Sequence, residues 1–424
     1  MSSKTVAVVG GAGHVGLPFA IAASKAHVVY IIDKNEKALN TIVSGELPFI
    51  EYGDEIYSDL EKGLYNGTIR LRNYSGVLKE CDYVVITMGT PVDAEGNGRV
   101  DDIIKYFDEE LIPNINRAKR VLVILRSTVA PGVSEILLKK LRKADTCAYL
   151  IYAPERVLQT RAYEEITKLP QIIGIDADGG EIFKPLAEEF FFPMGVTNLK
   201  WLTYREAECA KLVTNMARYV EFALANEFYM LADRLSTEED RIDMHKVIET
   251  AKEDYPRLAH LPLPGPNVGG PCLFKDGKFL LKNSPFNGLI STAFNINEGM
   301  PQFLFDKAKK EFKFWDGKTP KKIAILGMTF KADCDDPRNS LSFKLKKIAQ
   351  MEGIEVVCVD PYLYSAPPEG IKDCDIIFLM TPHVIFKDWR RLLDQVPIGT
   401  LLVDAWNFWN LDTPDGFYFK RDLD

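Results

Sequence analysis

A glycine-rich turn near the start of the chain constrains the fold more than any other feature. The apolar run Thr5–Gly10 has the β-branched composition of a buried strand, and the turn Gly11–Gly16 follows it at the opening of a helical stretch. A second strand-like run, Val28–Asp33, comes next. The segment therefore predicts a βαβ unit of a parallel sheet that is covered by helices on both faces.

The three glycines of this turn have the spacing of a dinucleotide-binding site. Gly11 permits the tight turn, Gly13 the close approach of a pyrophosphate, and Gly16 the close packing of helix against strand. The helix N-terminus then supplies amide donors to phosphates. Asp33 ends the second strand, where it can accept hydrogen bonds from a ribose, and its charge favours NAD although Lys34 is adjacent. The alternative is a glycine turn in an empty sheet.

Further apolar runs extend the first sheet and begin a second one. The first set is Tyr83–Thr87, Val121–Leu125, Ala148–Ala153 and Gln171–Ile175, and the second set is Lys322–Leu326, Val356–Asp360, Ile376–Met380 and Leu401–Asp404. Between them, Thr203–Asp254 has helical spacing without proline or glycine, and Leu261–Cys272 is a loop rich in both. We predict an α/β fold with two Rossmann-like doubly wound domains joined by a long central helix or helical domain.

Composition excludes several classes of protein. With 52 Lys and Arg against 60 Asp and Glu, the net charge of -8 argues against a broad nucleic-acid-binding surface. No apolar stretch reaches the ~18 residues of a membrane span, and no signal peptide precedes the first strand. No metal site is expected, because no cysteine or histidine cluster has zinc spacing. Reduced thiols in the cytoplasm fit the scattered cysteines: Cys81, Cys147, Cys209, Cys272, Cys334, Cys358 and Cys374.

Three sets of residues carry candidate chemistry outside the glycine turn. Cys272 lies in the Gly/Pro-rich loop, which we expect to lie outside the core, and Lys275 close by favours its thiolate. A thiolate near an NAD site indicates aldehyde-level chemistry through a hemithioacetal and a thioester. Lys211 and Asn215, four residues apart, share a helix face that by itself predicts a solvated surface. Glu155 follows a strand end and is a candidate base.

Together these stretches resemble the UDP-glucose/GDP-mannose dehydrogenase family, the NAD-dependent nucleotide-sugar 6-dehydrogenases, through nearly the whole chain. The resemblance is carried, in order, by Gly11–Gly16 with Asp33, Gly89–Pro91, Ser127–Val129, Ala153–Arg156, Glu208–Met216, Gly265–Asp276 and Gly327–Ser340. It implies an NAD-binding domain over residues 1–200, a central helical domain with the dimer contact and the catalytic cysteine over 201–315, and a UDP-sugar-binding domain over 316–424.

The resemblance also implies the site residues. A double oxidation of the sugar C6 hydroxyl would use Cys272 as the nucleophile, Lys211 with Asn215 for the oxyanion, Asp276 and Thr128 to hold the water and Glu155 as general base. The implied cofactor contacts are Gly11, Gly13, His14, Val15, Gly16, Asp33, Lys34, Gly89, Thr90, Pro91, Ser127, Thr128 and Arg338. The implied substrate contacts are Glu155, Arg156, Val157, Leu158, Lys211, Asn215, Arg257, Gly269, Phe330 and Lys331. For the His14 and His27 side chains we expect packing or surface roles.

The substrate signals within the family conflict. Ala153–Arg156 and Tyr255–Arg257 are similar to the branch that acts on UDP-N-acetylhexosamines, whereas Phe274–Asp276 keeps the form of the glucose branch. Asn339 stands where Glu is common and Trp406 where many members have Arg. We favour UDP-ManNAc or UDP-GlcNAc, with UDP-glucose as the alternative.

Two alternative functions are also considered, one of another enzyme and one of a non-catalytic protein. A simple hydroxyacid dehydrogenase leaves Cys272 and everything after Lys321 without a role, and a non-catalytic nucleotide-binding scaffold leaves the catalytic set unexplained. Members of the family dimerise through the central helix, so we expect a homodimer in which Arg257 reaches the neighbour's substrate site.

Overall fold

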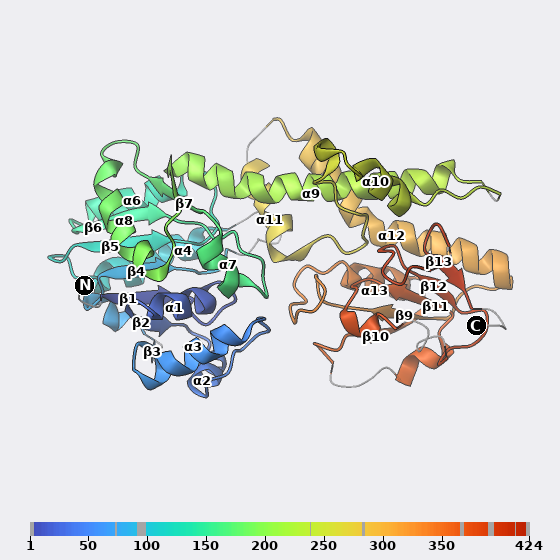
Figure 1. The fold of residues 1–424 in the computed structure, drawn as a ribbon, viewed down its shortest axis with the longest axis horizontal. Helices are drawn as coiled ribbons and strands as arrows, with labels where there is room; N and C mark the ends of the chain where they lie inside the picture. The colour runs from blue at the N-terminus through green and yellow to red at the C-terminus, as the bar shows by residue number, and fades with distance from the viewer. Residues whose placement is uncertain are drawn as a thin grey trace. The chain divides into compact units, whose positions relative to one another are not determined.

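The chain folds into two compact units (Figure 1). The first comprises residues 1–214 and 275–284, and the second comprises residues 215–274 and 285–424. The computed structural model describes residues 4–72, 74–90, 99–237, 239–281, 285–364, 369–388, 394–411 and 413–420. Two helices, α9 (Tyr204–Leu235) and α11 (Gly270–Leu281), contain residues of both units.

The first unit is built on an eight-stranded sheet of order β3-β2-β1-β4-β5-β6-β7-β8. Its strands are β1 (Thr5–Val9), β2 (Val28–Ile32), β3 (Ile69–Arg72), β4 (Tyr83–Ile86), β5 (Val121–Leu125), β6 (Ala148–Tyr152), β7 (Gln171–Ile175) and β8 (Leu199–Thr203). The first six strands are parallel, as the sequence predicts, but β7 runs antiparallel to β6 and carries β8 with it. The connection 153–170 therefore begins and ends at the same edge of the sheet.

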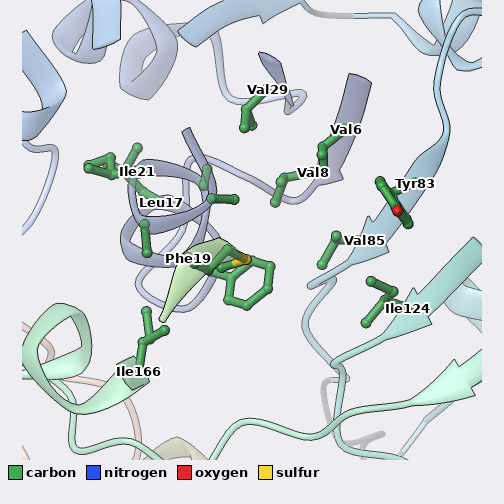
Figure 2. Close-up of a cluster of buried hydrophobic side chains, with 14 of the residues drawn as sticks. Val6, Val8, Leu17, Phe19, Ile21, Val29, Tyr83, Val85, Ile124 and Ile166 are labelled. Atoms are coloured by element: carbon green, nitrogen blue, oxygen red, sulfur yellow. The ribbon is translucent and has the colours of Figure 1, made fainter. Parts of the chain in front are cut away.

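Helices cover both faces of this sheet. Alternate residues of each strand point to opposite faces, so Val6 and Val8 enter one core and Ala7 and Val9 the other. Figure 2 shows the first of these cores, where Phe19 and Leu17 of α1 meet the strands. The helices are α1 (Gly16–Ser24), α2 (Glu36–Val43), α3 (Asp54–Tyr65), α4 (Asp101–Tyr106), α5 (Ile112–Asn114), α6 (Val133–Lys143), α7 (Ala162–Lys168) and α8 (Lys184–Phe191).

The second unit repeats the α/β arrangement on a smaller sheet of order β10-β9-β11-β12-β13. Its strands are β9 (Lys322–Leu326), β10 (Glu355–Val359), β11 (Ile376–Leu379), β12 (Leu401–Val403) and the antiparallel β13 (Phe417–Phe419). Apolar residues of α12 (Gly288–Asp316) and α13 (Ser342–Met351) pack on one face of this sheet. The helices are α9 (Tyr204–Leu235), α10 (Met244–Lys252), α11 (Gly270–Leu281), α12 (Gly288–Asp316) and α13 (Ser342–Met351).

These elements confirm the predicted fold class of two Rossmann-like domains with a long central helix. The predicted helical stretch from Thr203 to Asp254 is α9 followed by α10. Within the described part of the chain, no helix is both long enough and apolar enough to cross a bilayer.

Candidate active site

Four adjacent strands of the first unit end at one edge of its sheet. The register pairs Val9 with Ile86, Ile86 with Leu125 and Leu125 with Tyr152, so the carboxyl ends of β1, β4, β5 and β6 are aligned. The order of strands reverses between β1 and β4, which is where open α/β sheets bind ligands. The glycine turn and the segments around residues 87–90, 126–128 and 153–158 all follow these ends.

The glycine turn fits a pyrophosphate. A Cβ atom at Gly11 would lie 2.6 Å from the Val8 carbonyl oxygen, and one at Gly16 would lie 2.4 Å from that of Gly10, so only glycine allows this packing. At Gly13, in contrast, the nearest atom to such a Cβ would be 3.6 Å away, which leaves space for a ligand. The turn thus has the shape that the three glycine roles predict.

Asp33 closes the same turn from the second strand. Its Oδ2 accepts a hydrogen bond from the Ala12 amide at 3.1 Å, and its Oδ1 accepts one from Asn35. The His14 ring packs on Phe49 with centroids 4.2 Å apart, and His27 is buried and stacked on Phe190, so both histidines pack as expected. Burial lowers the pKa of His27.

The ends of β4 and β5 are joined by a threonine pair and a lysine from α11. The Thr90 hydroxyl donates to the Thr128 carbonyl at 2.9 Å and accepts from Lys275 Nζ at 2.7 Å. Lys275 also pairs with the fully buried Asp276 at 3.4 Å. Ser127 is buried and its hydroxyl donates to Ile86, while Gly89 is exposed. Pro91 lies outside the described residues.

Glu155 is held by donors on both carboxylate oxygens. Its Oε1 accepts from the Arg156 and Val157 amides at 2.8 and 3.1 Å, and its Oε2 accepts from the guanidinium of Arg126. Arg126 is only 2% exposed, and its guanidinium lies 4.1 Å from the ring centroid of Phe19. The candidate base is therefore an oriented carboxylate next to a buried cation.

The predicted substrate contacts after Glu155 belong to the connection that follows β6. The Arg156 guanidinium donates to the Pro170 carbonyl, and the Leu158 amide donates to Glu165 at 2.7 Å. The side chain of Leu158 is exposed, and that of Val157 packs beside the first core. These contacts fix the backbone that follows β6.

Lys211 and Asn215 are buried on α9, each 8% exposed. The solvated surface predicted from their spacing alone is therefore wrong, because their side of the helix is covered by protein. Earlier on the same helix, Glu208 is fully buried and accepts from the Gly132 and Ser134 amides at the start of α6, at 2.5 and 2.8 Å. Burial raises the pKa of the Glu208 carboxyl.

Cys272 belongs to the first turn of helix α11 and follows a buried segment. The expectation that the Gly/Pro-rich loop lies outside the core is wrong, since residues 264–270 are all buried. Glycine makes this possible: a Cβ at Gly265 would lie 2.0 Å from the Trp406 ring, and one at Gly270 would lie 2.6 Å from the Phe330 ring. Of the predicted substrate contacts, Gly269 belongs to this segment and Phe330 lies beside it.

The second unit has its own nucleotide-type turn after β9. Asp360 ends β10 and accepts from the Met328 and Thr329 amides at 2.6 and 3.0 Å, just as Asp33 accepts from the first turn. Buried His383 contacts Asp360 through Nε2 at 3.1 Å and accepts from the Asp333 amide at Nδ1. Burial acts to raise the pKa of Asp360, but the hydrogen bonds from His383 and from the Met328 and Tyr362 amides, with the charge interaction with His383, together outweigh it and lower that pKa.

Three predicted ligand residues of the second unit lie nearer the surface. The guanidinium of Arg338 is 59% exposed and binds Asp336 through two bonds of 2.8 and 2.6 Å. Lys331 is half-buried in the turn after β9. Arg257 is exposed and donates to the Tyr255 hydroxyl at 3.2 Å.

Some residues that organise these sites were missed from the sequence. Arg126 directly precedes the predicted Ser127. Its position just after a buried strand could have indicated that it belongs to the site. Asp360 closes its apolar run as Asp33 does, and this parallel could have indicated a second nucleotide-type turn. The buried Asn267 and His383 gave no such signal, because their partners lie in distant parts of the chain.

Comparison with known protein families identifies a nucleotide-binding domain around each of these two turns. Three family models describe successive parts of the chain: the NAD binding domain at residues 4–190, the central domain at 205–298 and the UDP binding domain at 324–411. The UDP-N-acetyl-D-mannosamine dehydrogenase of Methanocaldococcus jannaschii is 32% identical over 401 residues, covering 92% of this chain and 88% of that one. The chain belongs to the UDP-glucose/GDP-mannose dehydrogenase family. It is an NAD-dependent UDP-sugar dehydrogenase, and the glycine turn and Asp33 are the residues that fit NAD.

Solved structures are similar over the full length. One is the UDP-D-ManNAc dehydrogenase from Pyrococcus horikoshii, with 30% identity, 98% coverage of both chains and a TM-score of 0.86. Another is a UDP-N-acetyl-mannosamine dehydrogenase from Staphylococcus aureus, with 26% identity, 99% and 98% coverage and a TM-score of 0.81. Family membership removes the hydroxyacid dehydrogenase reading, since it accounts for the region after Lys321.

Proposed function

We propose that this protein oxidises the C6 hydroxyl of a UDP-N-acetylhexosamine to a carboxylate, with UDP-ManNAc as the favoured substrate. The observation that carries the choice of sugar is the similarity, at 26–32% identity over nearly the whole chain, to proteins named as UDP-ManNAc dehydrogenases. UDP-GlcNAc and UDP-glucose are the alternatives, the latter because Phe274–Asp276 has the glucose-branch form.

The reaction consumes two NAD and one water for each sugar. NAD, when bound, accepts a hydride from C6. The alcohol loses a hydride and a proton to become an aldehyde, and the Cys272 thiolate adds to it. Loss of a second hydride from the hemithioacetal leaves a thioester, and water then releases the carboxylate and the thiol. Position 272 in the first turn of α11 favours the thiolate, because the N-terminus of a helix carries partial positive charge.

Lys211 and Asn215 are proposed to stabilise the oxyanion. Both are buried side chains on one helix, and buried, preoriented donors of this kind stabilise developing negative charge strongly. Asp276, four residues after Cys272 on α11, and Thr128 are proposed to hold the water.

Glu155 is proposed to act on that water. Its carboxylate accepts three hydrogen bonds, from two backbone amides and the Arg126 guanidinium, which fix its orientation and occupy most of its acceptor positions. We therefore propose that Glu155 orients the attacking water more than it accepts the proton. We also propose that Arg338 contacts the cofactor, and that the other residues implied by the family resemblance contact the cofactor or the substrate as stated above.

The division into a cofactor domain, a central domain and a UDP-sugar domain is also proposed. The three family models at residues 4–190, 205–298 and 324–411 support boundaries near residues 200 and 316. We further propose a homodimer through α9, supported by four exposed apolar side chains on that helix: Val213, Leu224, Leu231 and Leu235.

NADH yield tests the proposed function. The wild-type protein should form two NADH per sugar with UDP-ManNAc, and the rates with UDP-GlcNAc, UDP-GalNAc, UDP-glucose and GDP-mannose should be lower. Cys272→Ala should lose thioester formation and fall in kcat by at least about 10³-fold, as nucleophile removal does in other enzymes that form covalent intermediates. One NADH per sugar, or an unaltered rate in Cys272→Ala, would contradict the mechanism. A higher kcat/KM for UDP-glucose would contradict the choice of sugar.

A further inference from the structure

The segment that leads to Cys272 is anchored inside the second unit at both ends. At its start, the Gly265 amide donates to Oδ1 of Asn226 at 2.9 Å, and Asn226 in turn donates to Asn297 of α12. At its end, the Gly270 amide donates to the Asn339 carbonyl at 3.3 Å. Both Asn226 and Asn297 are fully buried. The backbone two residues ahead of Cys272 therefore has fixed partners.

Asn267 lies in the middle of this segment and is 4% exposed. Its Oδ1 accepts from the Leu341 amide at 2.7 Å, and its Nδ2 donates to the Thr329 carbonyl at 2.9 Å. Nδ2 is also 2.8 Å from the Thr381 hydroxyl. The partners fix the orientation of the amide, because a flipped side chain would set its NH₂ group against the Leu341 N–H.

All of these partners belong to the turn after β9 or lie beside it. The amide of Thr329 donates to Asp360, and its carbonyl accepts from Asn267, from Ser340 and from Thr381 at 2.6 Å. Thr329 is fully buried, so these bonds are shielded from water. The backbone of one residue, Thr329, thus joins the acid of the nucleotide-type turn to the segment before the cysteine.

Packing makes this connection stiff. A Cβ at Gly269 would lie 2.8 Å from the Asn339 carbonyl oxygen, and the Phe330 ring fills the space beside Gly270. Close-packed interiors transmit displacement, since no void absorbs it. A shift of Phe330 or Thr329 on binding a ligand must therefore shift the segment.

We propose that Asn267 is a positioning residue that couples occupancy of the turn after β9 by a uridine diphosphate group to the placement of Cys272. The inference rests on the proposed function, in which this turn contacts the nucleotide and Cys272 is the nucleophile. Nucleotide bound at the turn moves the Thr329 backbone, and the hydrogen bonds of Asn267 to Thr329 and Leu341 carry that movement to the start of α11.

The test measures Cys272 without turnover. The second-order rate of Cys272 alkylation by iodoacetamide, followed by peptide mass spectrometry, is compared with and without saturating UDP. In the wild type, UDP should change this rate by about threefold or more, a typical coupling between two sites. In Asn267→Ala, the effect of UDP should fall below about 1.5-fold while calorimetry shows a UDP Kd within about threefold of the wild type.

Turnover provides a second readout. Asn267→Ala should lower kcat about tenfold and leave KM within about threefold, because a misplaced nucleophile slows chemistry without removing substrate contacts. If Asn267→Ala does not fold, Thr381→Val removes one of the four oxygen partners of Nδ2 and should reduce the UDP effect in the same direction. Thr400→Val is the matched control: its buried hydroxyl donates to Cys374 at 3.0 Å, and it should keep the full UDP effect.

A UDP effect of wild-type size in Asn267→Ala, or wild-type Cys272 that does not respond to UDP, would overturn the proposal. Failure of the proposed function is a different result, namely no NADH from any nucleotide sugar, and the alkylation assay does not depend on it.

Discussion

Arg126 is the single residue on which the carboxylate of Glu155 most depends. The guanidinium is 2% exposed, donates to Gln171 at 3.0 Å and pairs with Glu155, so removing it leaves a carboxylate without its cation. Breaking one partner of a buried pair is costly, and Arg126→Met should lower the free energy of unfolding by about 3 kcal/mol. Urea unfolding followed by fluorescence measures this.

A double variant separates pairing from packing. Arg126→Met with Glu155→Gln should recover at least about 1 kcal/mol of the loss, because the uncompensated charge is gone. Strict additivity of the two single variants would show that the pair is not coupled and that the stacking of Arg126 on Phe19 accounts for the loss.

Asp404 makes stability depend on pH. It is 1% exposed after β12, accepts from the Trp406 and Trp409 amides, and burial raises its pKa to about 6 from the ordinary 3.8. The folded state thus binds this proton more tightly than the unfolded state does. The resulting stabilisation is full below about pH 4 and is lost as the pH rises through about 6.

The difference in unfolding free energy between wild type and Asp404→Asn isolates this group. It should fall by about 2 kcal/mol between about pH 4.5 and 7.5, as linkage predicts for such a shift. A difference that stays constant over this range would mean that Asp404 titrates alike in both states.

At the scale of elements, α9 supplies the N-terminal cap of α6. Glu208 accepts from the Gly132 and Ser134 amides, which the first turn of a helix leaves without intrahelical partners. A glutamine would set an NH₂ group against one of these donors. Glu208→Gln should therefore cost about 1–3 kcal/mol in urea unfolding. Glu227→Gln, on an exposed position of the same helix, should change stability by less than about 0.5 kcal/mol.

The strands that carry the cofactor turn were predictable because their signals are local. The runs that form β1, β2 and β5 are short, apolar and bounded by turn residues, and the structure has them within a residue of the predicted limits. The antiparallel direction of β7 was not predictable, since an apolar run buried on both faces has the same pattern in either direction. Strand β3, Ile-Arg-Leu-Arg, was missed because only one of its four residues is fully buried.

The candidate site was predictable as far as its motifs extend. Gly13 and Asp33 lie where their spacing placed them, because a βα turn is built from residues close in sequence. The burial of residues 264–270 was not predictable: it depends on Trp406, which comes from far along the chain and fills the space that Gly265 leaves. Contacts between residues far apart in the chain produce no periodic pattern in the sequence.

At the scale of the whole molecule, the same turn has been built twice. In each unit, an aspartate directly after one strand accepts hydrogen bonds from backbone amides of the turn that follows the neighbouring strand. These aspartates are Asp33 after β2 and Asp360 after β10, and the turns follow β1 and β9. In the first unit this turn opens the NAD-binding domain, and in the second it opens the UDP-binding domain. The two units thus share one turn geometry, and we propose that each turn binds the nucleotide of its own domain.

The proposed homodimer concerns the whole molecule, and the support for it comes from one face of helix α9. Val213, Leu224, Leu231 and Leu235 of α9 are 42–67% exposed, and their separations keep them on one stripe of the helix. An exposed apolar stripe of this kind indicates a partner surface. Light scattering should therefore give about 96 kDa, twice the chain mass of 47.8 kDa.

Charge placed on the stripe should separate the copies. Leu224→Glu with Leu231→Glu should give 47.8 kDa with an unchanged circular dichroism spectrum, because two buried carboxylates per chain would lie at the interface without partners. Met351→Glu with Ile398→Glu places the same charges at exposed apolar positions away from α9 and should remain dimeric. A dimer that survives the α9 charges would place the interface on another surface, and a wild-type protein of 47.8 kDa would mean that α9 needs no partner.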